Sequence, residues 1–81
     1  MIYKLFTTPS CPGCVAAKEL LKNSGLKIET IEVIGNVNLE VAREYDVAMV
    51  PSLIEIDEKN PKKILGRYGK YEGIKAFLQN R

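Results

Sequence analysis

The sequence predicts an α/β protein whose elements follow one another in the order β-α-β-α-β-β-α. Two observations lead to this order. Apolar residues alternate with a period of two in some segments and recur at helical spacing in others, and clusters of Gly, Pro and Asn separate these segments. A mixed four-stranded sheet with helices on both faces accommodates all seven predicted elements. The length of 81 residues and the hydrophobic content of 46% predict a single domain spanning residues 1–81.

The first strand and helix are predicted from the N-terminal residues. Residues 2–7 (IYKLFT) are aromatic and β-branched, which favours a buried strand. Pro12 suits the first position of a helix, where its missing N–H group costs nothing. Cys14, Ala17 and Leu21 then recur at i, i+3 and i+7, so they form the buried face of that helix.

A second strand and a shorter helix are expected next. Gly25 suits the left-handed position at the end of the first helix. Residues 27–34 (KIETIEVI) alternate as a strand, parallel to the first and joined to it by a right-handed crossover. The shorter helix begins at about residue 38, capped by Asn36 or Asn38.

The C-terminal third predicts an antiparallel hairpin and a last helix. Its two strands are residues 50–57 (VPSLIEID) and residues 62–67 (KKILGR), and Pro61 argues that the second is an edge strand. The buried stripe of the last helix consists of Ile74, Phe77 and Leu78.

Composition excludes several classes of function. The net charge of +2 is too small to predict binding to nucleic acid or to an anionic membrane. No apolar run approaches the ~20 residues that span a bilayer, and the N-terminal residues lack the pattern of a signal peptide. We therefore expect a cytoplasmic protein. Histidine is absent, which excludes Cys–His catalysis and histidine metal ligands.

The two cysteines of the chain, Cys11 and Cys14, lie at the predicted start of the first helix. A disulfide between them would close a very short loop, so it would stabilise the fold little. A reversible redox couple fits better, because one thiolate can attack a substrate disulfide and the second thiol can release the product. The N–H groups and dipole of the helix start favour negative charge on Cys11. We therefore predict Cys11 as the nucleophile and Cys14 as the more buried resolving thiol.

A metal site is the alternative from a different class. Zinc usually takes four protein ligands, and this chain offers one cysteine pair and no histidine. A zinc site within one chain is therefore not predicted. Two chains sharing a zinc ion or an iron–sulfur cluster through four cysteines form the alternative hypothesis. Two incidental buried cysteines are disfavoured, because the pair follows a strand and has Pro12 at a helix start.

Several motifs together resemble the thioredoxin/glutaredoxin superfamily across nearly the whole chain: TTPSCPGC after the first strand, REYDVAMVPSLIEID, and GRYGKYEGIKAFLQ. The resemblance implies a minimal thioredoxin fold of glutaredoxin size. It implies that Pro51 is cis and packs over the cysteine pair, and that the Val50 backbone pairs with a bound peptide. Pro12 and Gly13 would belong to the same substrate-binding surface. A glycine before the last helix lines the groove of thioredoxins, and Gly66 is its nearest match here.

The chain departs from the family pattern at two places that bear on mechanism. Leu5 stands where typical thioredoxins have a buried aspartate, which is associated with proton transfer to and from the resolving thiol. The stretch GRYGKYEG also lacks the glycine pair and acidic residues through which glutaredoxins bind glutathione, although Arg67 could hold a glutathione carboxylate.

The function implied by the resemblance is that of a thiol–disulfide oxidoreductase that reduces protein disulfides. It requires no bound cofactor, because the dithiol itself carries the electrons. Its expected partners are disulfide-containing proteins and an electron source, either a flavoenzyme of the thioredoxin reductase type or glutathione. We expect a monomer that binds neither nucleic acid nor membrane. A glutathione-dependent glutaredoxin is the alternative with the same chemistry.

Overall fold

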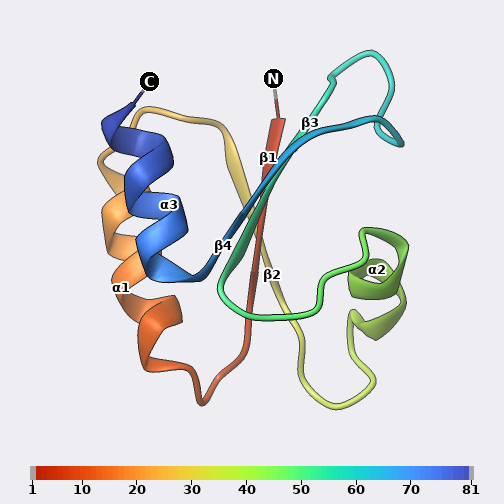
Figure 1. The fold of residues 1–81 in the computed structure, drawn as a ribbon. Helices are drawn as coiled ribbons and strands as arrows, with labels where there is room; N and C mark the ends of the chain where they lie inside the picture. Colours follow the sequence, from red (N-terminus) through yellow and green to blue (C-terminus); the bar gives the residue numbers. More distant parts are fainter. Residues whose placement is uncertain (1, 81) are drawn as a thin grey trace.

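A four-stranded sheet in the order β2-β1-β3-β4 forms the centre of the computed structural model, which describes residues 2–80 (Figure 1). The predicted order β-α-β-α-β-β-α is confirmed. The strands are β1 (Ile2–Thr7), β2 (Ile28–Glu32), β3 (Ser52–Ile56) and β4 (Ile64–Gly69), and the helices are α1 (Pro12–Lys22), α2 (Leu39–Glu44) and α3 (Lys70–Gln79).

The strand directions bring four connections to the same end of the sheet: those from β1 to α1, from β2 to α2, from α2 to β3 and from β4 to α3. β1 runs parallel to β2, and β3 runs antiparallel to β4, as predicted. β1 also runs antiparallel to β3. In this register Leu5 lies between Thr30 of β2 and Leu53 of β3. The ends of β1 and β2 and the start of β3 therefore lie at the same end of the sheet, which is at the bottom of Figure 1.

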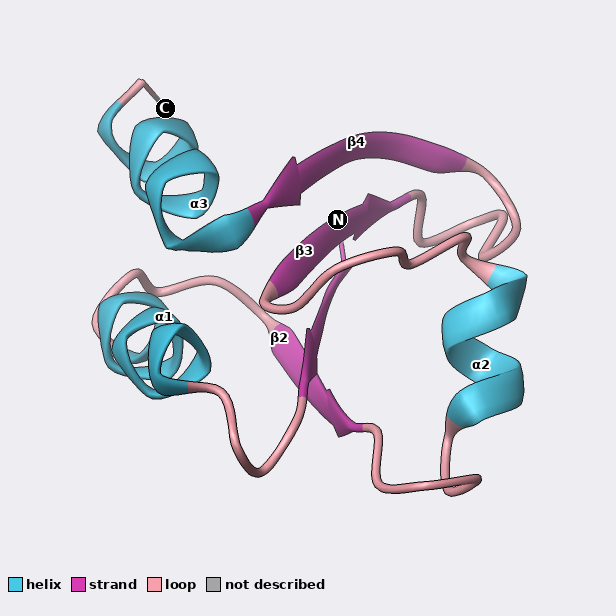
Figure 2. Ribbon diagram, turned by 60° about the horizontal axis from the view of Figure 1, so that its bottom comes forward, coloured by secondary structure: helices cyan, strands magenta, loops and turns pink. Residues whose placement is uncertain are grey.

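Alternation along the strands divides the apolar side chains between two cores. Helices α1 and α3 lie side by side over one face of the sheet, and α2 covers the other (Figure 2). Leu5 and Leu53 pack with Ile74 on the α1/α3 face. Their neighbours in sequence, Phe6 and Ile54, belong to the core on the α2 face. Helices on both faces were predicted, and this is confirmed.

Helix α1 begins and packs as its sequence predicts. Cys11 is the N-cap residue, and Cys14, Ala17 and Leu21 are the buried residues of the helix. After the helix, Gly25 adopts a left-handed conformation with φ of 77°, which glycine reaches at no steric cost.

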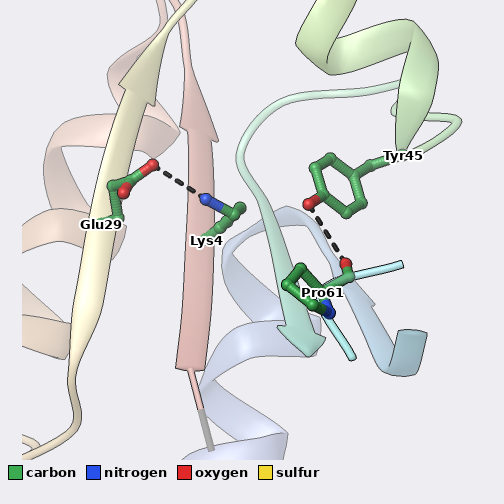
Figure 3. A network of polar contacts seen from close by, with 4 residues as sticks. All are labelled: Lys4, Glu29, Tyr45 and Pro61. Carbon is green, nitrogen blue, oxygen red and sulfur yellow. Dashed lines mark hydrogen bonds and ion pairs between the residues drawn. The ribbon is translucent and has the colours of Figure 1, made fainter. Parts of the chain in front are cut away.

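Helix α2 is held in a different way from that expected. Asn38 occupies the N-cap position but makes no side-chain capping bond. Its Nδ2 donates instead to the backbone oxygen of Glu32 at 2.9 Å. The predicted N-cap position of Asn38 is therefore confirmed, and the predicted capping by its side chain is wrong. Beyond the helix, the Tyr45 hydroxyl donates to the backbone oxygen of Pro61 at 3.3 Å (Figure 3). The same view shows Lys4 and Glu29, whose 2.9 Å ion pair links β1 to β2.

The predicted bounds of three strands need correction. β3 is Ser52–Ile56 and not residues 50–57. β4 lies at Ile64–Gly69 and not at residues 62–67. The preceding turn extends further because the Asn60 side chain accepts a hydrogen bond from the Lys62 N–H at 3.3 Å. β4 is an edge strand, as predicted, but Pro61 lies in the turn outside it.

β2 is also shorter than the predicted residues 27–34. It ends at Glu32, and Ile34 then pairs with Val37 in an isolated bridge. Within residues 2–80, no helix is both long and apolar enough to cross a membrane.

Candidate active site

The two cysteines lie at the end of the sheet where β1 ends and β3 begins. A short loop leads from β1 into α1, and within it the Cys11 N–H donates to the backbone oxygen of Thr8 at 3.4 Å. Pro12 is the first residue of α1. Its ring holds φ at a helical value and it has no N–H group to satisfy, so the helix starts directly after Cys11.

Cys11 caps this helix with its sulfur. Its backbone is extended, with φ of −103° and ψ of 106°. Its Sγ accepts a hydrogen bond from the Cys14 N–H at 3.1 Å. This donor and the helix dipole both stabilise negative charge on the sulfur. The side chain is half-buried, so a substrate can still reach it.

Cys14 has a contrasting environment. It is 1% exposed, and its pKa is raised from 9.0 to about 11, chiefly by burial and then by the hydrogen bond between its thiol and Cys11. The Thr8 backbone and the positive charge of Lys18 act in the opposite direction. Both cysteines are free thiols. The inner thiol therefore keeps its proton while the outer sulfur receives a hydrogen bond.

The Val50–Pro51 segment lies against the CPGC turn. The peptide bond between Val50 and Pro51 is cis, as the resemblance implied. A Cβ added at Gly13 would lie 3.5 Å from Cδ of Pro51, so the turn and the proline are neighbours. Within residues 2–80, neither backbone group of Val50 takes part in a hydrogen bond. The structure thus brings four of the predicted binding residues beside Cys11, and their roles in binding stay predictions.

Gly66 is not brought to this site. It pairs with Glu55 inside the β3–β4 ladder, where an added Cβ would meet the Tyr68 hydroxyl at 2.6 Å. Gly66 was chosen as the nearest match to the thioredoxin glycine before the last helix, but β4 continues to Gly69, so Gly66 lies inside the strand.

Gly69, the last residue of β4, lies closer to the cis proline. A Cβ at Gly69 would approach Sδ of Met49 at 2.9 Å, and the N–H of the next residue, Lys70, donates to the Pro51 oxygen at 2.8 Å. The signal in the sequence is that Gly69 directly precedes the last helix.

Two exposed apolar side chains flank the site. Val15, directly after Cys14, is 59% exposed, and Met49, directly before Val50, is 47% exposed. Met49 also borders a pocket of about 180 Å³ that Gly69 and Arg67 help to line. Apolar side chains left in water beside a reactive sulfur suit contact with a protein substrate.

Arg67 is engaged with the main chain. Its Nη1 donates to the backbone oxygen of Tyr45 and, at 3.5 Å, to that of Asp46. These bonds attach β4 to the end of α2, and they occupy part of the donor set that sequence reasoning offered to a glutathione carboxylate. Within residues 2–80, no group of three or more cysteine and carboxylate side chains is placed to hold a metal ion.

Comparisons with known proteins agree on the fold. The family model for glutaredoxin matches residues 3–63. No curated protein sequence matches the chain. Thioredoxin 1 from the thermophilic eubacterium Thermosipho africanus TCF52B is 21% identical, with a TM-score of 0.70 over 99% of this chain and 97% of that one. Fasciola hepatica thioredoxin is 16% identical, with a TM-score of 0.71 over 98% of this chain and 78% of that one. The predicted minimal thioredoxin fold is confirmed.

Proposed function

This chain belongs to the glutaredoxin family of thiol–disulfide oxidoreductases, and we propose that it reduces disulfide bonds in proteins, with Cys11 as the nucleophile and Cys14 as the resolving thiol. The observation that carries the proposal is the inequality of the two sulfurs. Cys11 accepts the Cys14 N–H at 3.1 Å at the start of a helix, whereas Cys14 is 1% exposed. An exchange reaction in two steps needs one accessible sulfur and one protected thiol.

The reaction proceeds through a mixed disulfide. The Cys11 thiolate attacks one sulfur of the substrate disulfide, and the other substrate sulfur leaves as a thiolate. The Cys14 thiol then loses its proton and attacks Cys11, which releases the second substrate sulfur. Two electrons pass from the dithiol to the substrate, and an intramolecular disulfide remains. Because the dithiol carries both electrons, the reaction requires no bound cofactor.

The backbone of Val50 supports a binding mode for the substrate. Its N–H and C=O groups are unpaired within residues 2–80, and an extended peptide can satisfy such groups as an added strand would. The exposed Met49, whose side chain occupies the space beside Gly69, offers an apolar contact next to this backbone. We propose that the peptide lies across Val50 and Pro51 with its disulfide over Cys11.

The electron source is either glutathione or a flavoenzyme of the thioredoxin reductase type. The match to the glutaredoxin family over residues 3–63 favours glutathione. The engagement of Arg67 with the end of α2 favours a flavoenzyme, because it removes part of the proposed glutathione contact. Oxidised protein should be offered each reductant separately, and the rate of dithiol recovery identifies the donor. A potential near ~−270 mV favours the flavoenzyme, and one nearer ~−200 mV favours glutathione.

Single cysteine variants test the assignment. Cys14→Ser should accumulate a stable mixed disulfide with a substrate protein, visible by mass spectrometry, because the first step remains and the second is removed. Cys11→Ser should form no such adduct, since the remaining thiol is buried and holds its proton. Adduct formation through Cys14 in Cys11→Ser, at the rate of the other variant, would overturn the assignment.

A further inference from the structure

One buried polar side chain takes no part in the steps above. Thr7, the last residue of β1, is 0% exposed. Its Oγ1 is the one buried side-chain oxygen or nitrogen within residues 2–80 that lacks a hydrogen-bond partner. Buried hydroxyl groups are almost always paired, because an unpaired one loses its hydration without compensation. The Thr7 hydroxyl is therefore available to donate to a group that becomes charged beside it.

The register of β1 places this hydroxyl under the first turn of α1. Leu5 packs with Ala17 on the α1/α3 face, and Thr7 shares that face because side chains alternate along a strand. α1 runs back along β1. From Leu5 to Thr7 the strand rises about 7 Å. Because α1 runs in the opposite direction, the step back from Ala17 to Cys14 covers about 4.5 Å in that same direction. Thr7 therefore lies beneath Cys14, the buried residue of that turn.

A second contact supports this placement. The Thr8 backbone stabilises negative charge on the Cys14 sulfur and acts to lower its pKa, so the residue that follows β1 lies close to that atom. The titratable groups that act on the Cys14 thiol are Cys11 and Lys18, both in or beside α1, and no carboxylate is among them. Leu5 from β1 is apolar. Besides the Thr8 backbone, the Thr7 hydroxyl is the neutral polar group that the end of β1 can offer to the Cys14 sulfur.

We propose that Thr7 is a positioning residue for the resolving step, and that its hydroxyl donates a hydrogen bond to the Cys14 thiolate as that thiolate forms. The inference rests on the proposed roles of the two cysteines. In the mixed disulfide, the Cys14 thiol passes its proton to solvent and its sulfur bonds to Cys11. The bond between Cys11 and the substrate breaks, and the substrate sulfur leaves with the electron pair. Thr7 keeps its own proton throughout.

The test separates the two steps by stopped-flow reaction with limiting 5,5′-dithiobis(2-nitrobenzoate). Attack by Cys11 releases one coloured thiolate, and resolution by Cys14 releases a second. Thr7→Val should slow the second release by about tenfold or more at neutral pH, because a hydrogen bond to a charged group is lost. The pH midpoint of that phase should rise. Thr7→Ser should restore both, and Thr7→Ala provides a second variant without the hydroxyl.

Two controls make the result specific. Thr30→Val makes the same chemical change at an exposed position of β2, and it should alter neither phase. In the Cys14→Ser background, which reports the first phase alone, Thr7→Val should leave the rate of attack unchanged. An unchanged second phase in Thr7→Val, or an equal loss in both phases, would overturn the role of Thr7. If the unmodified protein shows no second phase at all, the proposed roles of the cysteines are overturned instead.

Discussion

The two faces of the sheet hold their helices by different means. On one face, α1 with 11 residues and α3 with 10 pack against each other and against the strands. On the other, α2 has six residues, of which Ala42 alone is buried. The residues just outside its ends, Asn38 and Asp46, have positive φ values of 61° and 52°. Apolar packing fixes the first face, and short polar bonds contribute more to the second.

The difference bears on where the chemistry lies. The start of α1 must present Cys11 outward and Cys14 inward, so it requires a helix whose position is fixed along its whole length. Packing of Leu21 and Ala17 against the strands supplies this constraint. α2 carries no proposed catalytic group. It closes the opposite core with the help of Tyr45, whose hydroxyl reaches Pro61, and of Arg67.

The largest expected effect compares adjacent residues of β3 that face opposite ways. Leu53 belongs to the α1/α3 core and is 0% exposed, and Ile54 belongs to the α2 core and is 2% exposed. Either change to Ala should lower the free energy of unfolding by about 2–5 kcal/mol, since each leaves a cavity. Denaturant titration measures both losses.

The two variants should differ in redox kinetics. Leu53→Ala should also slow the Cys14 step, because Leu53 shares its cluster with Ala17, one helical turn beyond Cys14. Ile54→Ala should leave that step unchanged under conditions where both variants are folded. Equal slowing in the two variants would mean that the faces are not separate in the way described.

The sequence predicts the α1/α3 face better than the other. β1 and the start of α1 follow from local signals, since the alternation in residues 2–7 and Pro12 before the buried face act within a few residues of each other. The side chain of Asn38 was misassigned because its best partner, the Glu32 oxygen, becomes available only when the chain folds back. The preference of asparagine for N-cap positions depends only on neighbouring residues, so it cannot predict a hydrogen bond to the Glu32 oxygen.

The groove glycine was missed for a similar reason. The start of β4 depends on pairing with β3, whose register shifts between Glu55 and Ile56. Gly66 was taken from the resemblance as the nearest glycine before the last helix, and only the pairing with β3 shows that it lies inside β4 while Gly69 ends the strand. The unpaired hydroxyl of Thr7 also follows from tertiary structure alone, because threonine is common in strands for reasons unrelated to chemistry.

The next effect tests the burial of Cys14 through pH. Its pKa in the folded protein is raised to about 11 from an ordinary 9.0. Below pH 9 both states hold the proton, so the stability is fully present. As the pH rises toward 11 the unfolded chain loses its proton first, and stability falls by up to about 3 kcal/mol. Cys14→Ala should lack this decline, as measured by denaturant titration of reduced protein at pH 8 and pH 10.5.

A smaller effect is expected on the α2 face. Tyr45→Phe removes the hydrogen bond to Pro61 and keeps the buried ring, which packs beside Phe6 with ring centroids 6.0 Å apart. Stability should fall by about 0.5–1.5 kcal/mol, with no change in either redox phase. A loss near zero would show that this bond contributes nothing, and the account of how α2 is held would then depend on Arg67.

The smallest effect is expected at Gly13, and its matched control is a glycine beyond the other end of α1. Gly13 lies in the first turn, and an added Cβ would meet Pro51 at 3.5 Å, an ordinary contact. Gly13→Ala should therefore stabilise the fold by about 0.5–1 kcal/mol, the usual gain from replacing glycine in a helix. Gly25→Ala is the matched control. With φ of 77°, it should destabilise by about 1–2 kcal/mol. Thermal unfolding of both variants measures the two changes in stability. Destabilisation by Gly13→Ala would mean that the turn and Pro51 are packed more tightly than the 3.5 Å contact indicates.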